Sequence, residues 1–212
     1  GLSRAMEMIG ERWALLIIRD LFVGPKSFAE LRAGLPRISP GTLTARLTEL
    51  ERTGVVRRQG PQPSPEAVVY ELTPYGLQLE AAIAELARWG ARSLGEPRPD
   101  DIVTVDSMIM ALRTTFHPEA ARGFTAGYEL RLGEMVIHAR IDDGALRVAQ
   151  GPLPDADLVI EPGMALRALM AGELDPAEAV RNGSVRITGD PALLTRFTEI
   201  FTFRAEPSLV AT

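Results

Sequence analysis

The sequence contains no cysteine and only two histidines, His117 and His138. Without cysteine, these 212 residues can form neither a disulfide nor a thiolate metal site, and a zinc site would need carboxylate ligands. No apolar run approaches the ~20 residues of a membrane-spanning helix, and no basic segment followed by an apolar one opens the chain. We therefore expect no metal, no membrane partner and a cytoplasmic location.

Basic residues are also scarce relative to acidic ones, but only in the second half of the chain. Composition is that of an ordinary globular protein, with 46% hydrophobic and 24% charged residues and a net charge of −5. Residues 1–98 are slightly basic by count (+2), whereas residues 99–212 are acidic (−7). Such asymmetry is one hint of nucleic-acid binding in the less acidic half, although a mixed surface would explain it equally well.

Helical patterns fill the first part of the chain. Apolar residues at spacings of three and four predict a helix over residues 2–22, ended by Gly24-Pro25. Ser27 and Glu30 form a capping-box pattern for a short helix over residues 27–34. Ser39 and Pro40 then predict a third helix that ends near residue 53 and turns three leucines inward: Leu43, Leu47 and Leu50.

Two strands follow the third helix. Residues 55–58 and 68–72 flank the segment GPQPSPEA, whose alternate prolines predict an extended tip rather than a tight hairpin. Thr73-Pro74 begins another helix with Leu79, Ile83, Leu86 and Trp89 at helical spacing. This order of elements is typical of a winged helix-turn-helix, which presents its third helix to the major groove of DNA.

The predicted DNA contacts come from the third helix and its flanks. The outward residues of that helix are small, which permits close approach to the bases, and Arg46 can reach a guanine edge or a phosphate. The helix start can hold a phosphate, and flanking cations should meet the DNA backbone. Arg57 and Arg58 could instead be a solvated strand end. The predicted contacts are Lys26, Arg37, Ser39, Gly41, Thr42, Thr44, Ala45, Arg46, Arg57 and Arg58.

The second half has a different pattern. A helix over residues 104–116 precedes four short alternating strands, then two helical segments, a strand around residues 185–187 and a last helix from Asp190-Pro191. We therefore predict an α+β protein, its second domain a mixed or antiparallel sheet of about five strands packed on helices. The predicted boundaries are 1–94 for the winged helix domain, 95–101 for a linker and 102–212 for the second domain.

Specific motifs of the first 93 residues resemble the HxlR-type winged helix-turn-helix regulators. The resemblance implies a homodimer formed largely by the first and last helices of the domain, which binds an inverted-repeat operator and represses, or less often activates, neighbouring genes. Many such regulators carry a cysteine just upstream of the first helix; this sequence begins close to that position and contains no cysteine. The motifs are Ile9-Gly10-Glu11-Arg12-Trp13, Ile18-Arg19-Asp20-Leu21, Gly24-Pro25, Phe28-Ala29-Glu30-Leu31-Arg32, Ile38-Ser39-Pro40, Leu43-Thr44-Ala45-Arg46-Leu47, Leu50-Glu51, Gly54-Val55-Val56, Tyr70-Glu71-Leu72-Thr73-Pro74-Tyr75-Gly76 and Trp89-Gly90.

Residues 104–203 resemble the sterol carrier protein-like fold through Ile141-Asp142-Asp143-Gly144, Asp155-Ala156-Asp157-Leu158, residues 169–176 and Ile187-Thr188-Gly189-Asp190. The resemblance implies an apolar tunnel for a small molecule such as a fatty acid or a sterol-like compound. The alternative is that the same side chains simply fill a core, although methionine suits an adaptable pocket. Candidate lining residues are Met108, Phe116, Phe124, Tyr128, Met135, Met164, Met170, Phe197 and Phe201.

The sequence offers no catalytic constellation. It has no glycine-rich phosphate loop and no convincing Ser/His/Asp set. Asp142-Asp143-Gly144 is better interpreted as a turn than as a calcium loop, and Asp155 and Asp157, predicted on one face of a strand, have no acid–base partner. We expect a cofactor-free transcriptional regulator that represses as a DNA-bound homodimer at the bacterial nucleoid. The alternative is an apolar-ligand carrier whose winged helix mediates protein contacts.

Overall fold

The computed structural model describes residues 1–60, 68–95 and 101–203. The chain folds into two compact units, Gly1–Leu86 and Ala87–Thr212. Residues 61–67, which include most of the proline-rich tip, and residues 96–100 of the expected linker lie outside the described residues. The three predicted domain boundaries therefore stay a prediction.

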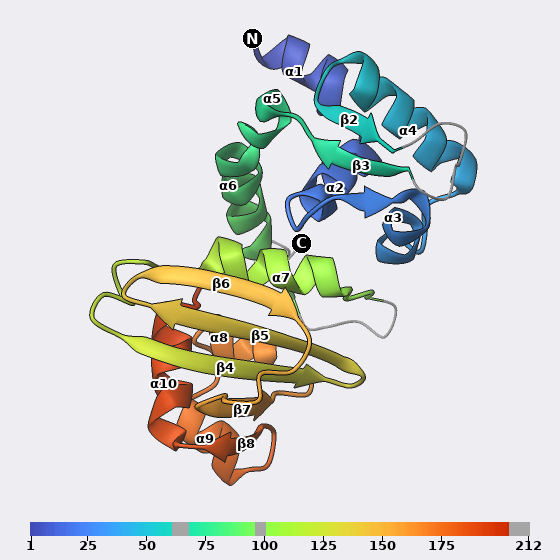
Figure 1. The fold of residues 1–212 in the computed structure, drawn as a ribbon. Helices are drawn as coiled ribbons and strands as arrows, with labels where there is room; N and C mark the ends of the chain where they lie inside the picture. The colour runs from blue at the N-terminus through green and yellow to red at the C-terminus, as the bar shows by residue number, and fades with distance from the viewer. Residues whose placement is uncertain (61–67, 96–100, 204–212) are drawn as a thin grey trace, which may run out of the picture. The chain divides into compact units, whose positions relative to one another are not determined.

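The first unit is a winged helix. Its elements are α1 (Leu2–Ile9), α2 (Arg12–Leu21), β1 (Lys26–Ser27), α3 (Phe28–Gly34), α4 (Pro40–Arg52), β2 (Val56–Gln59), β3 (Val69–Leu72), α5 (Pro74–Leu77) and α6 (Glu80–Ala91), the last of which continues past Leu86 (Figure 1). The three strands form an antiparallel sheet in the order β1-β3-β2. The predicted order of helices and strands is confirmed, and the two-residue strand β1 is an addition too short to have a sequence pattern.

The predicted helix starts are confirmed by their side-chain caps. The Ser27 hydroxyl accepts a hydrogen bond from the Glu30 amide at 3.2 Å, and the Ser27 amide donates to the Glu30 carboxylate at 2.7 Å. Ser39 accepts from the Thr42 amide at 3.1 Å, with Pro40 in the first turn of α4. These side chains satisfy amides that have no partner inside the helix.

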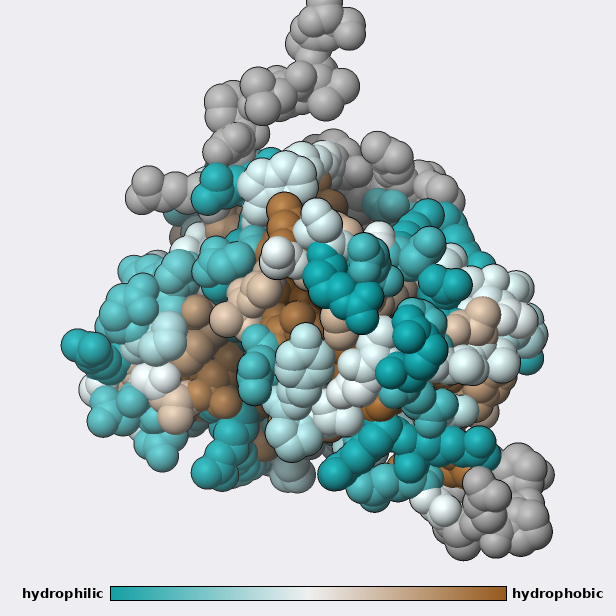
Figure 2. Space-filling model, turned by 90° about the horizontal axis from the view of Figure 1, so that it is seen from above, coloured by the Kyte–Doolittle hydropathy of each residue, from teal (hydrophilic) through white to brown (hydrophobic). Residues whose placement is uncertain are grey.

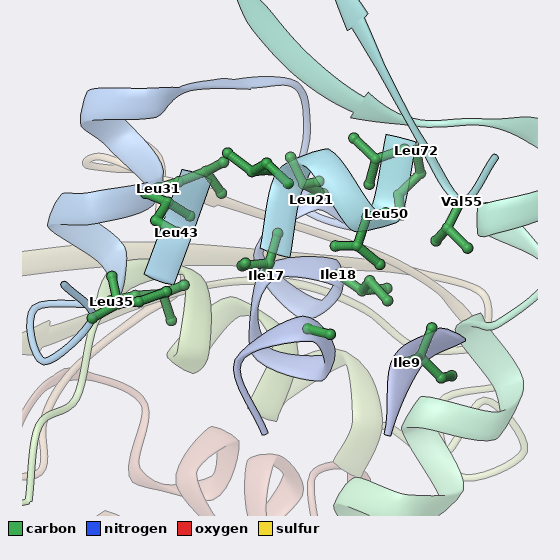
Figure 3. Close-up of a cluster of buried hydrophobic side chains, with 14 of the residues drawn as sticks. Ile9, Ile17, Ile18, Leu21, Leu31, Leu35, Leu43, Leu50, Val55 and Leu72 are labelled. Atoms are coloured by element: carbon green, nitrogen blue, oxygen red, sulfur yellow. The ribbon is translucent and has the colours of Figure 1, made fainter. Parts of the chain in front are cut away.

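The predicted single helix over residues 2–22 is wrong, because the chain forms two helices there. The Gly10 amide closes α1 on the Met6 carbonyl at 2.9 Å, and Glu11 is extended at the start of α2. The break lets Ile9 of α1 share one core with Ile17 and Ile18 of α2 (Figure 3). A second prediction fails in the same way: the helix after Thr73 is interrupted between α5 and α6.

The core of the first unit determines which way α4 faces. Leu43, Leu47 and Leu50 are buried, as predicted, in one cluster with Ile17 and Leu31. Figure 3 shows Leu43 and Leu50 in that cluster. Since residues three and four apart share one helix face, the opposite face of α4 is left toward solvent.

The second unit is the predicted α+β domain. Its elements are α7 (Val105–Thr115), β4 (Thr125–Leu132), β5 (Met135–Asp142), β6 (Ala145–Gln150), β7 (Leu158–Glu161), α8 (Leu166–Met170), α9 (Pro176–Arg181), β8 (Arg186–Gly189) and α10 (Pro191–Ile200) (Figure 1). The sheet order is β6-β5-β4-β7-β8; β4 and β7 are parallel and the other neighbours antiparallel, so the sheet is mixed.

That strand order requires residues 151–157 to cross β5 and β4 on the way from β6 to β7. The Leu153 amide donates to the Glu129 carboxylate at 2.6 Å, and the Asp157 carboxylate accepts from the Gly127 amide at 2.7 Å. Asp155 pairs with Arg140 at 2.5 Å. The prediction that Asp155 and Asp157 share a strand face is therefore wrong: both lie in this crossing, which they hold to the sheet.

Glycine is needed beneath the crossing. A Cβ on Gly127 would lie 2.8 Å from the Leu153 side chain, and Leu153 is buried. At the other predicted turn, Asp143 and Gly144 both have positive φ, of 44° and 82°, and join β5 to β6. The turn prediction for Asp142-Asp143-Gly144 is confirmed.

Three further features bear on function. In the described parts of the chain no helix is both long and apolar enough to cross a bilayer. The same residues include no group of three or more His, Asp or Glu side chains placed to hold a metal ion. His138 lies half-buried on β5, with Nδ1 3.0 Å from the Gly151 carbonyl oxygen.

Candidate nucleic-acid interface

The outer face of α4 consists of small side chains. Gly41, Thr44 and Ala45 are exposed and Thr42 is half-buried. The Thr44 hydroxyl donates to the Pro40 carbonyl at 3.0 Å. Because its proton is used within the helix, this hydroxyl offers mainly its acceptor lone pairs to a molecule outside. A smooth face with acceptor groups can approach the amino groups that bases display in the major groove.

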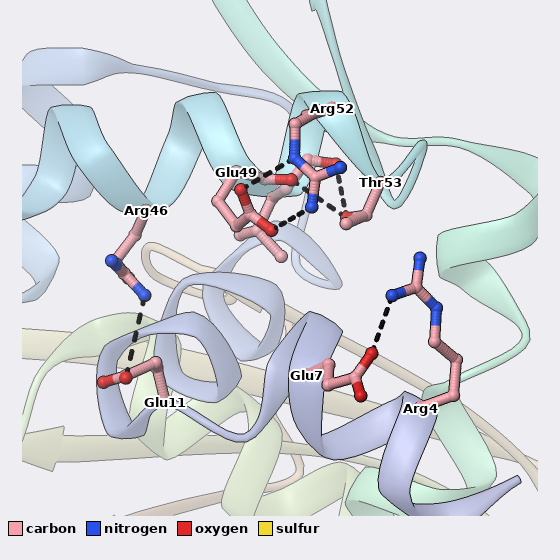
Figure 4. Close-up of polar contacts among 8 residues, drawn as sticks. Arg4, Glu7, Glu11, Arg46, Glu49, Arg52 and Thr53 are labelled. Atoms are coloured by element: carbon pink, nitrogen blue, oxygen red, sulfur yellow. Dashed lines mark hydrogen bonds and ion pairs between the residues drawn. The ribbon is translucent and has the colours of Figure 1, made fainter.

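Arg46, the predicted base-reading residue, lies at the side of that face. Its side chain is 29% exposed, and its Nη1 is 4.0 Å from a carboxylate oxygen of Glu11, at the start of α2 (Figure 4). Glu11 is itself 72% exposed. The guanidinium therefore lies against a carboxylate that the sequence prediction missed, since nothing in the spacing of the two residues links them.

The C-terminal part of α4 neutralises its own charge. Arg52 makes two hydrogen bonds to Glu49, at 3.0 and 2.6 Å (Figure 4). These bonds lower the pKa of the Glu49 carboxyl. The charge of Arg52 is therefore already matched by a carboxylate on its own helix.

The two wing arginines differ in their surroundings. Arg57 of β2 pairs with Glu71 across the sheet at 2.5 Å, and Gln59 donates to the same carboxylate. Arg58 lies opposite Tyr70 in the strand register and is exposed, on the other face of the strand because side chains alternate. Of this pair, Arg58 is the one whose charge is not matched by a cross-strand carboxylate.

The remaining predicted contacts flank α4. Arg37 is exposed in the loop before α4, and Ser39 is the exposed N-cap. Lys26 is half-buried in β1. The fold thus brings the start of α4 and the wing strands into one unit, and two of the predicted residues, Arg46 and Arg57, already lie in ion pairs.

Large apolar side chains are also exposed on the first unit's helices. Seen from above, hydrophilic residues cover most of the surface, with apolar groups between them (Figure 2). Leu2 and Met6 of α1 are 77% and 49% exposed, and Leu86 of α6 is 49% exposed. Exposed apolar residues gathered on an element are typical of a surface that another protein covers.

In the second unit, four of the predicted tunnel residues pack on one another. Ring centroids are 4.7 Å apart for Phe197 and Phe201, 5.4 Å for Tyr128 and Phe197, and 5.6 Å for Phe116 and Phe201. The Tyr128 hydroxyl donates to the Leu193 carbonyl at 3.2 Å, and burial raises the pKa of that phenol. This aromatic cluster is part of the core between the sheet and α10.

The other candidate lining residues are spread more widely. Met170 is buried, whereas Met108, Phe124 and Met135 are half-buried. The guanidinium of Arg196 lies 5.2 Å from the ring centroid of Phe124. Met164 is 71% exposed, so it lies on the surface rather than beside the aromatic cluster.

Two family profiles match separate parts of the chain. That of the HxlR-like helix-turn-helix family matches residues 8–97. That of the SCP-2 sterol transfer family matches residues 112–202.

The first part of the chain is also similar to known regulators. It is 42% identical over 102 residues to an HTH-type transcriptional regulator of Mycobacterium tuberculosis, covering 47% of this chain and 61% of that one, about three fifths of the relative's length. The HTH-type transcriptional regulator YodB of Bacillus subtilis is 40% identical over 88 residues, covering 42% of this chain and 79% of YodB. The reduced form of YodB superposes with a TM-score of 0.39 at 36% identity, covering 45% of this chain and 94% of that structure. The chain therefore belongs to the HxlR-like helix-turn-helix family of transcriptional regulators and carries an SCP-2 sterol transfer domain in its second half.

Proposed function

We propose that this regulator binds an inverted-repeat operator as a homodimer and represses transcription at the bacterial nucleoid, without catalysing a reaction. The observation that carries the proposal is the outer face of α4, where small side chains lie opposite three buried leucines. An α-helix is about 10–12 Å across and the major groove is about 12 Å wide. Small residues at Gly41, Thr44 and Ala45 would let the helix backbone approach the base edges.

A second copy of the chain is the proposed partner. The exposed apolar residues of α1 and α6 offer a self-complementary surface of the kind that a two-fold dimer buries. Two copies would place their α4 helices on half-sites about one helical turn apart, roughly 34 Å. The operator is then expected to be a pseudo-palindrome.

Selection of DNA sites from a random pool, followed by affinity measurements, tests this proposal and separates two kinds of contact. Arg46→Ala should change the selected base at one position per half-site, at a cost of about 1–3 kcal/mol for the wild-type site. Arg58→Gln should weaken binding to every sequence and lower the salt slope by about 1, because a phosphate contact carries no sequence information.

Arg147→Gln is the matched control, since Arg147 is exposed on β6 of the second unit. It should leave both the selected sequence and the salt slope unchanged. A pool that yields no enriched site, or an affinity that does not depend on salt, would overturn the proposal.

The second unit is proposed to bind an apolar small molecule, such as a fatty acid or a sterol-like compound, that shifts operator affinity. Support comes from the SCP-2 match. A coupling of about 1–3 kcal/mol between the two sites would be typical. Displacement of a bound fluorescent fatty acid, measured with and without operator DNA, gives this coupling free energy. If no compound displaces the probe saturably, the second unit does not bind the proposed effector.

A further inference from the structure

A polar cavity of about 440 Å³ lies in the second unit, apart from the aromatic cluster. Its lining comes from the ends of strands and from the turns between them. Three glycines leave stretches of backbone wall without side chains, and the polar groups are two arginines, a glutamate and a serine. The lining residues are Arg131, Gly133, Glu161, Gly163, Gly183, Ser184 and Arg186.

Three charged residues form a row across neighbouring strands. Parallel pairing of Leu130 with Ile160 places Arg131 of β4 beside Glu161 of β7, and Glu161 is paired with Arg186 of β8. Directly paired residues project on the same side of a sheet, so Arg131, Glu161 and Arg186 share one face. The two guanidiniums stand two strand spacings apart at their backbones, about 9–10 Å.

Each arginine is oriented by a carboxylate that leaves part of its guanidinium available. Arg131 donates through Nε to Glu129 at 2.7 Å, and Glu129 is only 2% exposed. Its terminal Nη groups have no partner among the described residues. Arg186 donates through Nε and Nη2 to one oxygen of Glu161, at 3.1 and 2.6 Å, so its Nη1 is likewise available.

The buried Glu129 holds Arg131 in place before an anion arrives, whereas Arg186 is 80% exposed and is held by Glu161 alone. Donors held in place before a ligand arrives cost less conformational entropy when it binds, and the planar guanidinium suits carboxylate and phosphate oxygens. Counted with Glu129, the two arginines and two carboxylates are formally neutral, so the anion would be held by the remaining guanidinium N–H groups rather than by net charge. The second oxygen of Glu161 adds an acceptor between the two guanidiniums. The cavity volume falls within the range typical of small-molecule sites, about 300–1,000 Å³.

We infer that this cavity binds an elongated small anion with an acceptor group at each end and a hydrogen-bond donor between them. Arg131 and Arg186 would each take one end, and Glu161 would accept from the donor. Hydroxylated dicarboxylates and phosphorylated polyols have this chemistry. Inorganic phosphate offers only one end group, so it is expected to make fewer of these contacts.

Isothermal titration calorimetry on the full chain, without DNA, tests the inference independently of the proposed operator binding. The probes are malate, succinate, glycerol 3-phosphate and inorganic phosphate. Malate and succinate differ by one hydroxyl, so succinate should bind roughly 2- to 10-fold more weakly than malate, the effect of one hydrogen bond. A preference for malate or for glycerol 3-phosphate identifies carboxylate or phosphate as the end group, and inorganic phosphate should bind least.

Arg186→Gln is the decisive variant because Arg186 is 80% exposed and its loss should not disturb folding. It should weaken the best probe at least about tenfold, as expected for a hydrogen bond to a charged group. Ser184→Ala and Arg131→Lys should weaken it less, and the control Arg147→Gln should leave it unchanged. No saturable binding of any probe, or affinity retained in Arg186→Gln with an unaltered thermal unfolding curve, would overturn the inference.

Discussion

At the scale of single residues, Glu129 shows how a buried charge is kept in the fold. Burial by itself would raise the pKa of the Glu129 carboxyl, but the hydrogen bonds from the Leu153 amide and from Arg131 outweigh it and lower the pKa. The ionised carboxylate thereby holds the crossing segment 151–157 against the sheet. A buried charge is tolerated only when paired in this way.

Glu129→Gln should therefore destabilise the second unit by about 1–3 kcal/mol at pH 7. A lowered pKa in the folded state means that the carboxylate stabilises the wild type above the unfolded pKa, ordinarily about 4.3, and that this contribution is lost as the pH falls through the folded value. The difference in free energy of unfolding between the wild type and the variant should thus become smaller below about pH 4. Urea denaturation at pH 7 and in this acid range measures it.

Glu134→Gln is the matched control, since Glu134 is exposed in the turn between β4 and β5. It should change the free energy of unfolding by less than about 0.5 kcal/mol at either pH. A Glu129→Gln variant that unfolds like this control would show that the carboxylate does not hold the crossing.

Glu11 is expected to influence the proposed DNA contact through its neighbour Arg46. Its carboxylate lies 4.0 Å from Nη1 of Arg46 and would also repel phosphates. Glu11→Gln should raise affinity for non-specific DNA, because a negative charge is removed, and should reduce discrimination at the base that Arg46 reads. Competition between operator and random DNA measures both, and a uniform change for the two DNAs would argue against orientation of Arg46 by Glu11.

At the scale of elements, α4 is held by two independent features. Ser39 caps its start, and its three leucines pack into the core. The wing is tied to the helices at another point, because the Val55 carbonyl accepts from the Thr73 amide and lies close to Gly76 of α5. The orientation of the strands relative to α5 therefore depends on a residue without a side chain.

Gly76→Ala should disrupt that junction. A Cβ there would lie 2.2 Å from the Val55 carbonyl oxygen, so the backbone must move, and we expect a loss of more than about 2 kcal/mol. Gly90→Ala, in α6 with nothing within 4 Å, should instead stabilise by about 0.5–1 kcal/mol through helix propensity. Urea denaturation, monitored by far-UV circular dichroism, compares the stabilities of the two variants. Equal changes in the free energy of unfolding would contradict the steric role of the Val55 carbonyl.

At the scale of the whole molecule, the proposed function depends on the assembly of two copies. Met6 of α1 is 49% exposed and Leu2 is 77% exposed, although both are apolar. If a second copy covers them, burial of the exposed half of each Met6 side chain stabilises the dimer by roughly half the value for full burial, about 0.7–1.5 kcal/mol. Each substitution acts twice because the interface is two-fold symmetric.

Met6→Glu should therefore raise the dimer dissociation constant at least about tenfold and weaken operator binding with it. Met164→Glu is the matched control, because Met164 is 71% exposed on the second unit. Sedimentation velocity over a concentration series measures the dissociation constant. If Met164→Glu dissociates the dimer and Met6→Glu does not, the dimer surface does not lie on α1.

Much of the architecture could be predicted from the sequence because its signals are local. Caps such as Ser27, Ser39 and Thr73 and the spacing of Leu43, Leu47 and Leu50 involve residues within one or two turns. The alternation of apolar and polar residues likewise predicted the strands of the second unit. The chain order of all its elements was predicted with them. The interruption at Gly10 and Glu11 had no such signal, since it serves the shared burial of Ile9 with Ile17 and Ile18.

What the sequence alone determined is thus the order of elements, the inward face of α4 and the family. Only the tertiary structure placed Glu11 beside Arg46, buried Glu129 beneath a chain crossing, and aligned Arg131, Glu161 and Arg186 across three strands. Hydrogen-bonded caps and helical or strand periods act between near neighbours in the chain. Strand order and helix packing instead join residues that are distant in sequence, and no local pattern encodes which of them meet.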